Sequence, residues 1–485
     1  MLTTESCARA KRLAAPLWLW VALGAVGLLG CVLESSTIGS GPQPSSYRWW
    51  IYVPEGSYAL AHDIFYLSMA LLILAWMALG VHAAEGRLSV ARSWIVLGLW
   101  GLPLFLGTPV FGRDVYSYIA QGVLARRGFN PYVIAPKMLG PGPLLSSVAS
   151  VWRSTASPYG PLFVDVTHFG AAVASSSLIG QVLVFRSLEL PGIAILMICL
   201  PMLARHYGAN AGVAIWLGVL SPLALFSAVS SAHNDTLMIA LMVAALTVAL
   251  RGARRWALVL LAVAATIKLP AAAGIVFLTA SQMSGASSRK RWRLGAEAVV
   301  IPFAVITAVS ELSGYGWTWL SPTALRIPTE LRVLTTPVVS VATLISSLVH
   351  AMGDGVATHT VITAVQDVFG VLALVIAALL VTRTRASNVT YLLGATLLLV
   401  VVASPTVWPW YFLWGLTVLG AISVQRSAGL CTVAAFAMLL VGPGGTPLIG
   451  GNAFYVTGPL LLGGIGWFLW HARWRRVLEG VDRVV

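Results

Sequence analysis

Asp114 is the residue whose type and position point most directly to chemistry. The chain has 16 Asp and Glu among 485 residues, and Asp114 directly follows an apolar run that ends near Val110. A carboxylate at the edge of a hydrocarbon layer is costly, so its presence there indicates a functional site. Flanked by Arg113, Tyr116 and Tyr118, it could take the proton from a sugar hydroxyl that attacks a lipid-linked glycosyl phosphate. The structural alternative is an Arg113–Asp114 ion pair that fixes the loop.

A second polar cluster, Ser231-Ala-His-Asn-Asp235, separates the apolar runs 211–229 and 236–250. His233, Asn234 and Asp235 could position a substrate hydroxyl or bind a cation. Asn and Asp are also common helix caps, so the cluster could instead cap a helix that begins at Thr236. The sequence supports a role in a site and a role as a cap equally.

Basic residues provide candidates for holding phosphate. Lys268 lies at the turn of an apolar hairpin over residues 256–283, in Lys268-Leu-Pro270. A lysine in this setting needs an anion, which a lipid phosphate would supply, or it snorkels to the surface. Arg326 and Arg332 lie in the outer segment 313–360, where they would bind phosphate through bidentate contacts or remain solvated.

Aromatic residues accompany these candidates. Tyr159 lies in Ser157-Pro-Tyr-Gly-Pro161, and its ring, like those of Tyr116 and Tyr118, would stack on a sugar face. Trp408-Pro-Trp-Tyr411 follows an apolar run, which predicts an aromatic belt at a membrane interface, with sugar stacking as the alternative.

The composition predicts an all-α polytopic membrane protein, because 58% of the residues are hydrophobic and only 9% are charged. The net charge of +14 resides mostly in short loops between apolar runs, which indicates the positive-inside bias of a membrane protein rather than binding to nucleic acid. The run from Pro16 to Leu33 is long for a signal peptide and is expected to be a first transmembrane helix.

Apolar runs predict about 14 membrane passes within one membrane domain spanning residues 1–485. The basic loops should face the cytoplasm, while segments 112–179 and 313–360 should lie outside with helices of their own. Glu297 and Asp367, inside two of the runs, are expected to be buried and hydrogen-bonded, with a proton path as the alternative. The predicted runs are 15–34, 62–84, 92–111, 180–204, 211–229, 236–250, 256–268, 270–283, 294–312, 361–382, 387–404, 410–425, 429–443 and 455–470.

Several motifs are absent from the sequence. It has no Walker motif, no HExxH and no Asp-x-Asp, so neither ATP nor a nucleotide sugar is the expected donor. The four cysteines are scattered, with no CxxC pair or Cys/His cluster. We expect no bound cofactor, with a divalent cation held by Asp114 and Asp235 as the alternative.

Taken together, Gly112-Arg-Asp-Val-Tyr-Ser-Tyr-Ile-Ala-Gln-Gly122, Asn130-Pro-Tyr132, Ser157-Pro-Tyr-Gly-Pro161, His233-Asn-Asp235 and Lys268 resemble a known family. This is the family of actinobacterial polyprenol-phosphomannose-dependent α-(1→6)-mannopyranosyltransferases (MptA/MptB type), which are GT-C glycosyltransferases. The resemblance runs over most of the chain and is densest over residues 105–275.

The resemblance implies a GT-C architecture with about 12–14 transmembrane helices and extracytoplasmic loop helices. It implies inverting transfer of mannose from polyprenyl-phosphate-mannose to an α-(1→6)-mannan acceptor in lipomannan and lipoarabinomannan synthesis. The active site would face the outer side of the plasma membrane, with Asp114 as general base. The expected substrate-binding residues are Arg113, Tyr116, Tyr118, Tyr159, His233, Asn234, Asp235, Lys268, Arg326 and Arg332. The expected partners are the donor, the mannan lipoglycan acceptor and membrane lipids, but no nucleic acid.

Three alternatives stay open at this point. A flippase for a polyprenyl-linked sugar would need a continuous polar route across the bilayer, whereas the polar clusters gather on one side of the predicted topology. A related transferase would use another polyprenyl-phosphate sugar, such as arabinose. A non-catalytic scaffold would leave Asp114 and Lys268 unexplained.

Overall fold

A computed structural model describes residues 16–35, 58–321, 336–352 and 357–422 of the chain. The described residues form helices joined by turns and contain no strand. This confirms the predicted all-α class.

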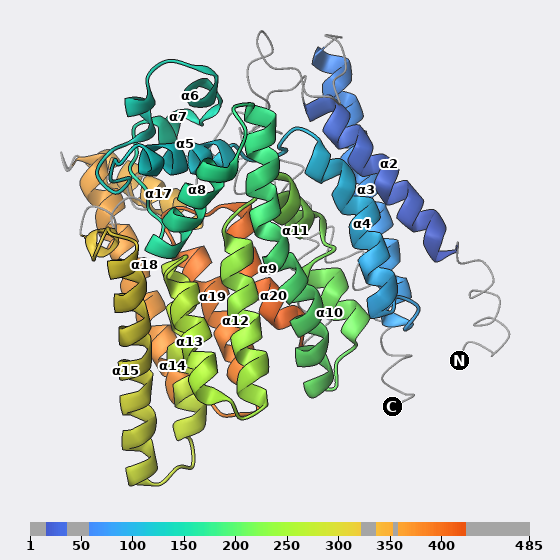
Figure 1. Cartoon of the computed structure of the whole chain (residues 1–485). Helices are drawn as coiled ribbons and strands as arrows, with labels where there is room; N and C mark the ends of the chain where they lie inside the picture. The colour runs from blue at the N-terminus through green and yellow to red at the C-terminus, as the bar shows by residue number, and fades with distance from the viewer. Residues whose placement is uncertain (1–15, 36–57, 322–335, 353–356, 423–485) are drawn as a thin grey trace, which may run out of the picture.

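Three antiparallel helices form one side of the molecule (Figure 1). They are α2 (Leu17–Ser35), α3 (Tyr58–Ala84) and α4 (Val90–Leu106). The helices α2 and α3 pack closely because α2 carries glycines on the shared face: a Cβ atom on Gly27 would lie 2.6 Å from the Ser68 carbonyl oxygen.

Further helices fill the centre and the opposite side of the molecule (Figure 1). Their bounds are α9 (Leu178–His206), α12 (Asp235–Leu250), α13 (Arg254–Ala265), α14 (Ala272–Met283), α15 (Ser288–Leu312), α17 (Pro337–Ala351), α18 (Thr358–Thr382), α19 (Val389–Ala403) and α20 (Leu413–Gly420). Between α9 and α12, α10 (Ala211–Gly218) and the helical stretch Pro222–Ser230 form one segment bent by 51°. Pro222 begins the second half, where its missing N–H interrupts the helix.

Five described helices are long and apolar enough to cross a membrane, or six if the bent segment counts as one span. They correspond to the predicted runs 15–34, 62–84, 180–204, 294–312 and 361–382, within a few residues at each end. Most other predicted runs are shorter helices, and the hairpin turn is confirmed, since α13 ends at Ala265 and a new helix starts at Leu269. The predicted runs 429–443 and 455–470 lie outside the described residues.

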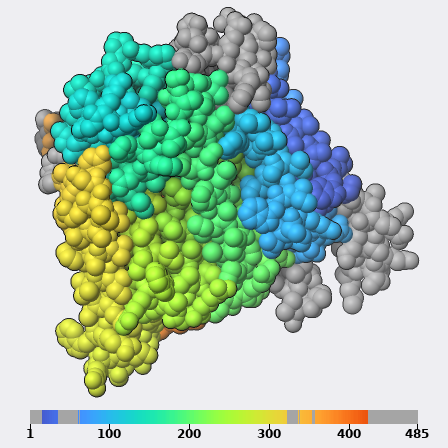
Figure 2. All heavy atoms as spheres, in the orientation of Figure 1, coloured from blue at the N-terminus to red at the C-terminus, as the bar shows by residue number. Residues whose placement is uncertain are grey.

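The segment 112–179 forms a cap of short helices at one end of the molecule (Figure 1). It contains α5 (Asp114–Arg126), α6 (Pro143–Ser147), α7 (Ser150–Arg153) and α8 (Pro161–Val173). Figure 2 shows the teal atoms of this segment packed together above the yellow and green helices. The Arg-containing turns between α3 and α4 and between α12 and α13 lie at the opposite end of the molecule.

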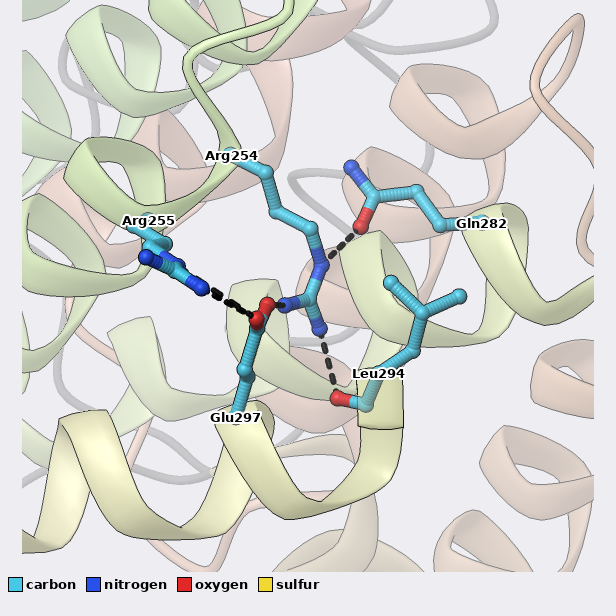
Figure 3. Close-up of polar contacts among 5 residues, drawn as sticks. All are labelled: Arg254, Arg255, Gln282, Leu294 and Glu297. Atoms are coloured by element: carbon cyan, nitrogen blue, oxygen red, sulfur yellow. Dashed lines mark hydrogen bonds and ion pairs between the residues drawn. The ribbon is translucent and has the colours of Figure 1, made fainter. Parts of the chain in front are cut away.

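An ion-pair cluster at the end opposite the cap joins α13, α14 and α15 (Figure 3). The Arg254 guanidinium donates to the Glu297 carboxylate, to Gln282 and to the Leu294 carbonyl, and Arg255 Nη2 lies 2.9 Å from Glu297 Oε1. Glu297 therefore has two arginine partners and serves as a structural link. The expectation of burial was wrong for Asp367, which is exposed on α18.

Candidate active site

Asp114 is the first residue of α5, and only 7% of it is exposed. Its Oδ1 accepts a hydrogen bond from Trp152 Nε1 at 2.9 Å, and its Oδ2 lies 3.4 Å from His233 Nδ1. The second partner comes from the other polar cluster in the sequence. The structure therefore brings the two predicted polar clusters together at one carboxylate.

Two strained backbone turns position this pair of residues. Phe111 and Ala232 are the described non-glycine residues with positive φ, at 61° and 50°, and they precede Asp114 and His233. Such strain persists only where surrounding contacts enforce it, and it is typical of functional sites. Here Ser231 Oγ donates to the Val110 carbonyl at 2.7 Å, which ties the two turns to each other.

Arg186 on α9 also holds the same two turns. Its guanidinium donates to the carbonyl oxygens of Phe105 and Gly107 before the first turn and of Ser230 before the second. One buried side chain thus fixes the two backbone segments that carry Asp114 and His233. All of these bonds go to backbone carbonyl oxygens, so Arg186 fixes the main chain of the two turns directly.

The environment of Asp114 suits a proton acceptor. Burial raises its pKa to about 6, against the opposing charge of Lys268 and the hydrogen bond from Trp152, which lower it. A carboxyl group with this pKa is mostly ionised at neutral pH yet is a stronger base than an ordinary aspartate. General bases are most effective when their pKa lies near the working pH.

His233 is held as a neutral ring against Asp114. Burial, followed by the charge of Lys268, lowers its pKa well below the usual range. The ring stacks on Trp410, with centroids 3.9 Å apart and planes at 19°. A Cβ atom on Gly112 would come within 3.1 Å of His233 Nε2, so the ring occupies the space left by that glycine. With its proton on Nδ1, neutral His233 would present a donor to Asp114.

Asn234 and Asp235 complete the second cluster, and the capping interpretation fails for both. Asn234 precedes α12 without making a side-chain cap bond, and within the described structure neither atom of its buried amide has a hydrogen-bond partner. Asp235 instead pairs with Lys268, whose Nζ lies 2.8 Å from Asp235 Oδ1, and it also accepts a bond from Trp414 Nε1. Lys268 is thus not a lone cation, because Asp235 supplies an anion.

Lys268 lies among aromatic rings in the wall of a cavity of about 270 Å³. Its Nζ is 4.4 Å from the Tyr411 ring centroid and 5.2 Å from that of Trp414. It is the one charged residue among the described residues that line this cavity. The lining consists of Trp152, Pro158, Tyr159, Gly160, Lys268, Leu269, Pro270, Trp319, Leu320, Val400, Val401, Ser404, Thr406, Trp408, Tyr411 and Trp414.

The cavity has a polar end and an apolar side. Trp152 belongs to its wall and is bonded to Asp114, so the carboxylate lies directly behind the wall. Leu269 and Val400 also line it and are 45% and 38% exposed on the molecular surface. An apolar wall of the cavity therefore reaches the outside of the helix bundle.

The other predicted residues lie at different distances from this cavity. Tyr159 lines it. Tyr118 is buried and contacts the Tyr159 ring edge-to-face, with the two ring centroids 5.3 Å apart. Tyr116 is fully buried, and its hydroxyl has no hydrogen-bond partner in the described structure. Arg113 lies half-buried at the start of α5. Arg326 and Arg332 fall outside the described residues.

Sequence reasoning missed or misjudged several tryptophans. Trp408 and Tyr411 line the cavity and Trp410 stacks on His233, so these aromatic side chains lie beside the residues of the site. Trp414, which binds Asp235, was not predicted, although the density of aromatics over residues 408–414 was a signal.

Metal ligands are sparse in this region. The described part of the chain has no group of three or more His, Cys, Asp and Glu side chains placed to hold a metal ion. Asp114 and Asp235 would be the two carboxylates available, and each already accepts a bond from a tryptophan N–H.

Comparison with known sequences decides the family. Residues 21–284 match the model described as alpha-(1->6)-mannopyranosyltransferase, N-terminal domain, and residues 331–471 match that described as MptB C-terminal domain. The chain belongs to the α-(1→6)-mannopyranosyltransferase family. The first match contains Asp114, Asp235 and Lys268, and the second contains Trp408–Trp414, so both parts of this mannopyranosyltransferase line the cavity.

Named relatives cover most of this mannopyranosyltransferase. It is 30% identical over 416 residues to alpha-(1->6)-mannopyranosyltransferase A of Mycobacterium tuberculosis, a match that covers 83% of this chain and 79% of the relative. It is 25% identical over 444 residues to alpha-(1->6)-mannopyranosyltransferase B of Corynebacterium glutamicum, covering 83% of this chain and 73% of the relative. The predicted resemblance is confirmed, and the protein is a glycosyltransferase of the mannosyltransferase class.

Proposed function

We propose that this protein transfers mannose from polyprenyl-phosphate-mannose to an α-(1→6)-mannan acceptor of lipomannan and lipoarabinomannan, with Asp114 as general base. One observation carries the proposal: a buried carboxylate with a raised pKa lies behind the wall of an aromatic cavity, and among the described residues that line this cavity one is charged, a lysine. This combination offers a base for the acceptor hydroxyl and a cation for the donor phosphate.

The cavity offers a separate region for each part of the donor. The Lys268 ammonium would bind the phosphate, leaving its contact with Asp235. Rings of Tyr159, Trp408 and Tyr411 would pack on the mannose, since sugar C–H faces favour aromatic surfaces. The apolar wall at Leu269 and Val400 would take the first units of the prenyl chain and direct it toward the membrane.

The reaction would be a single displacement at the anomeric carbon. Asp114 takes the proton of the acceptor 6-hydroxyl while that oxygen bonds to C1, and the bond from C1 to the phosphate oxygen breaks. Polyprenyl phosphate leaves with the electron pair of that bond. Because attack and departure occur on opposite faces, a β-linked donor gives an α-linked product. Lys268 stabilises the charge that grows on the leaving phosphate, and this interaction is stronger in the transition state than in the bound donor.

The fold supports an outward-facing site in the plasma membrane. Basic turns between helices lie at the end opposite the cap that carries Asp114 (Figure 1). Under the positive-inside rule that end faces the cytoplasm, so segments 112–179 and 313–360 face outward as loops of a single membrane domain over residues 1–485. The donor and the lipoglycan acceptor would meet at that face, and no bound cofactor takes part.

The test is transfer by the purified full-length protein in lipid nanodiscs. The donor would be radiolabelled polyprenyl-phosphate-mannose, the acceptor a short α-(1→6)-mannoside, and the product linkage would be read by NMR. We expect a new α-(1→6) bond from mannose and none from polyprenyl-phosphate-arabinose. Transfer of arabinose would show that the donor assignment is wrong. In proteoliposomes, movement of the donor across the bilayer without glycoside formation would identify a transporter.

A further inference from the structure

A second group of residues of the kind that bind sugars lies beside the cavity. Trp319 lines the cavity and also packs against Tyr132 and Val164 in a small buried cluster of its own, with Tyr315 and Ile306 against it. Trp319 Nε1 donates to Ser310 Oγ at 3.0 Å, which fixes its ring. One side of this tryptophan therefore faces the cavity region and the other faces a second aromatic surface.

Tyr132 provides an unused polar group in this cluster. It is only 8% exposed, and its hydroxyl has no hydrogen-bond partner in the described structure. Its backbone N–H donates to Asn130 Oδ1 at 2.9 Å, which holds the turn after α5. Its ring contacts the Tyr315 ring edge-to-face, with the two ring centroids 5.6 Å apart. A buried hydroxyl without a partner is uncommon and unfavourable, so a bound ligand is a physical explanation for it.

Asp165 on α8 brings a carboxylate to the edge of this cluster, because the preceding residue, Val164, is buried in it with Tyr132. Burial is the main cause that raises the pKa of Tyr132 and Tyr315, and the Asp165 charge adds to it in both. Asp165 is half-buried, and within the part of the chain that the structure describes it forms no side-chain hydrogen bond or ion pair.

We infer that Tyr132, Asp165 and Tyr315 form a second sugar subsite, which binds the acceptor mannan at a residue beyond the one being extended. The carboxylate and the tyrosine hydroxyl would bond to pyranose hydroxyls, and the rings would pack on a pyranose face. A prenyl chain would leave both polar groups unpaired, which favours a saccharide at this place. The inference rests on the proposed function for the identity of the saccharide.

Acceptor length provides the kinetic test. For a mono-mannoside and an α-(1→6)-tetramannoside, KM would be measured with wild type, Tyr132→Phe and Asp165→Asn. We expect each variant to raise the ratio of tetramannoside to mono-mannoside KM by about fivefold, the effect of losing one hydrogen bond. The matched controls are Tyr207→Phe and Asp367→Asn. The Tyr207 hydroxyl contacts Thr390 at the start of α19, and Asp367 is exposed on α18. An unchanged ratio in both subsite variants would overturn the inference.

A binding measurement separates this inference from the transfer reaction. Tetramannoside binding to the full-length protein in nanodiscs would be followed by saturation-transfer NMR, without donor. We expect contacts from the tetramannoside that Tyr132→Phe and Asp165→Asn both weaken and Tyr207→Phe does not. If wild type binds the tetramannoside in this way but transfers no mannose, the proposed function fails and the subsite stands. If transfer occurs but neither subsite variant alters binding, the subsite is refuted.

Discussion

Replacing Trp152 by Phe tests whether the environment of Asp114 sets the working pH. The change keeps an aromatic ring in the cavity wall and removes the N–H that donates to Asp114 Oδ1 at 2.9 Å. This bond favours the ionised carboxylate, so its loss raises the pKa of Asp114 from about 6. Hydrogen bonds to charged groups contribute about 1.5 kcal/mol or more, and one pKa unit corresponds to about 1.4 kcal/mol, so we expect a rise of about one unit.

The assay is kcat/KM for mannose transfer as a function of pH. A general base acts when deprotonated, so activity rises with pH through its pKa, and the acidic limb of Trp152→Phe should lie about one unit above that of wild type. The variant would then be about fivefold slower near pH 6 and almost equal to wild type near pH 8. Trp292→Phe, at a tryptophan that is 82% exposed on α15, is the matched control. A loss of equal size at every pH, or an unmoved limb, would refute the reasoning.

Three further changes address the neighbouring residues. Lys268→Met should raise the donor KM at least about tenfold. It also leaves the buried Asp235 carboxylate unpaired, which should lower the melting temperature. Adding Asp235→Asn should restore the melting temperature but not the donor affinity. Gly112→Ala places a methyl carbon 3.1 Å from His233 Nε2, which should displace the ring from its position beside Asp114. We expect kcat to fall several-fold at an unchanged donor KM. An unchanged kcat would contradict this account of the ring position. Glu297→Gln removes the ion pairs between α13 and α15, one of which, to Arg255, is screened by solvent. The free energy of unfolding should fall by about 1 kcal/mol, and the KM values should not change. Altered KM values would show that this cluster influences the site.

Features that depend on neighbouring residues could be predicted from the sequence. The hairpin at Lys268-Leu-Pro270 was predictable because a proline cannot continue a helix and basic residues flank both arms. Asp114 and Asp235 were found because a carboxylate beside an apolar run is rare for energetic reasons. These signals are local, and they located the turns that carry the site.

Pairings between distant residues could not be predicted in this way. Trp152 and Asp114 are 38 positions apart, and Trp414 and Asp235 are 179 apart, so no spacing rule links them. Trp408 and Tyr411 were assigned to a membrane belt because aromatics at the end of an apolar run look alike whether they face lipid headgroups or a cavity. The partners of Glu297 were missed because Arg254 and Arg255 start a different helix.

The most direct test of the account is transfer by Asp114→Asn measured together with donor binding. Asn keeps the shape of the side chain and can still accept the Trp152 hydrogen bond, but it cannot act as a base. The account predicts that transfer at saturating donor falls by at least about a hundredfold, while affinity for polyprenyl-phosphate-mannose stays within a few-fold of wild type. Asp63→Asn, at an exposed position on α3, is the matched control. Transfer at the wild-type rate by Asp114→Asn would contradict the central claim that Asp114 takes the acceptor proton.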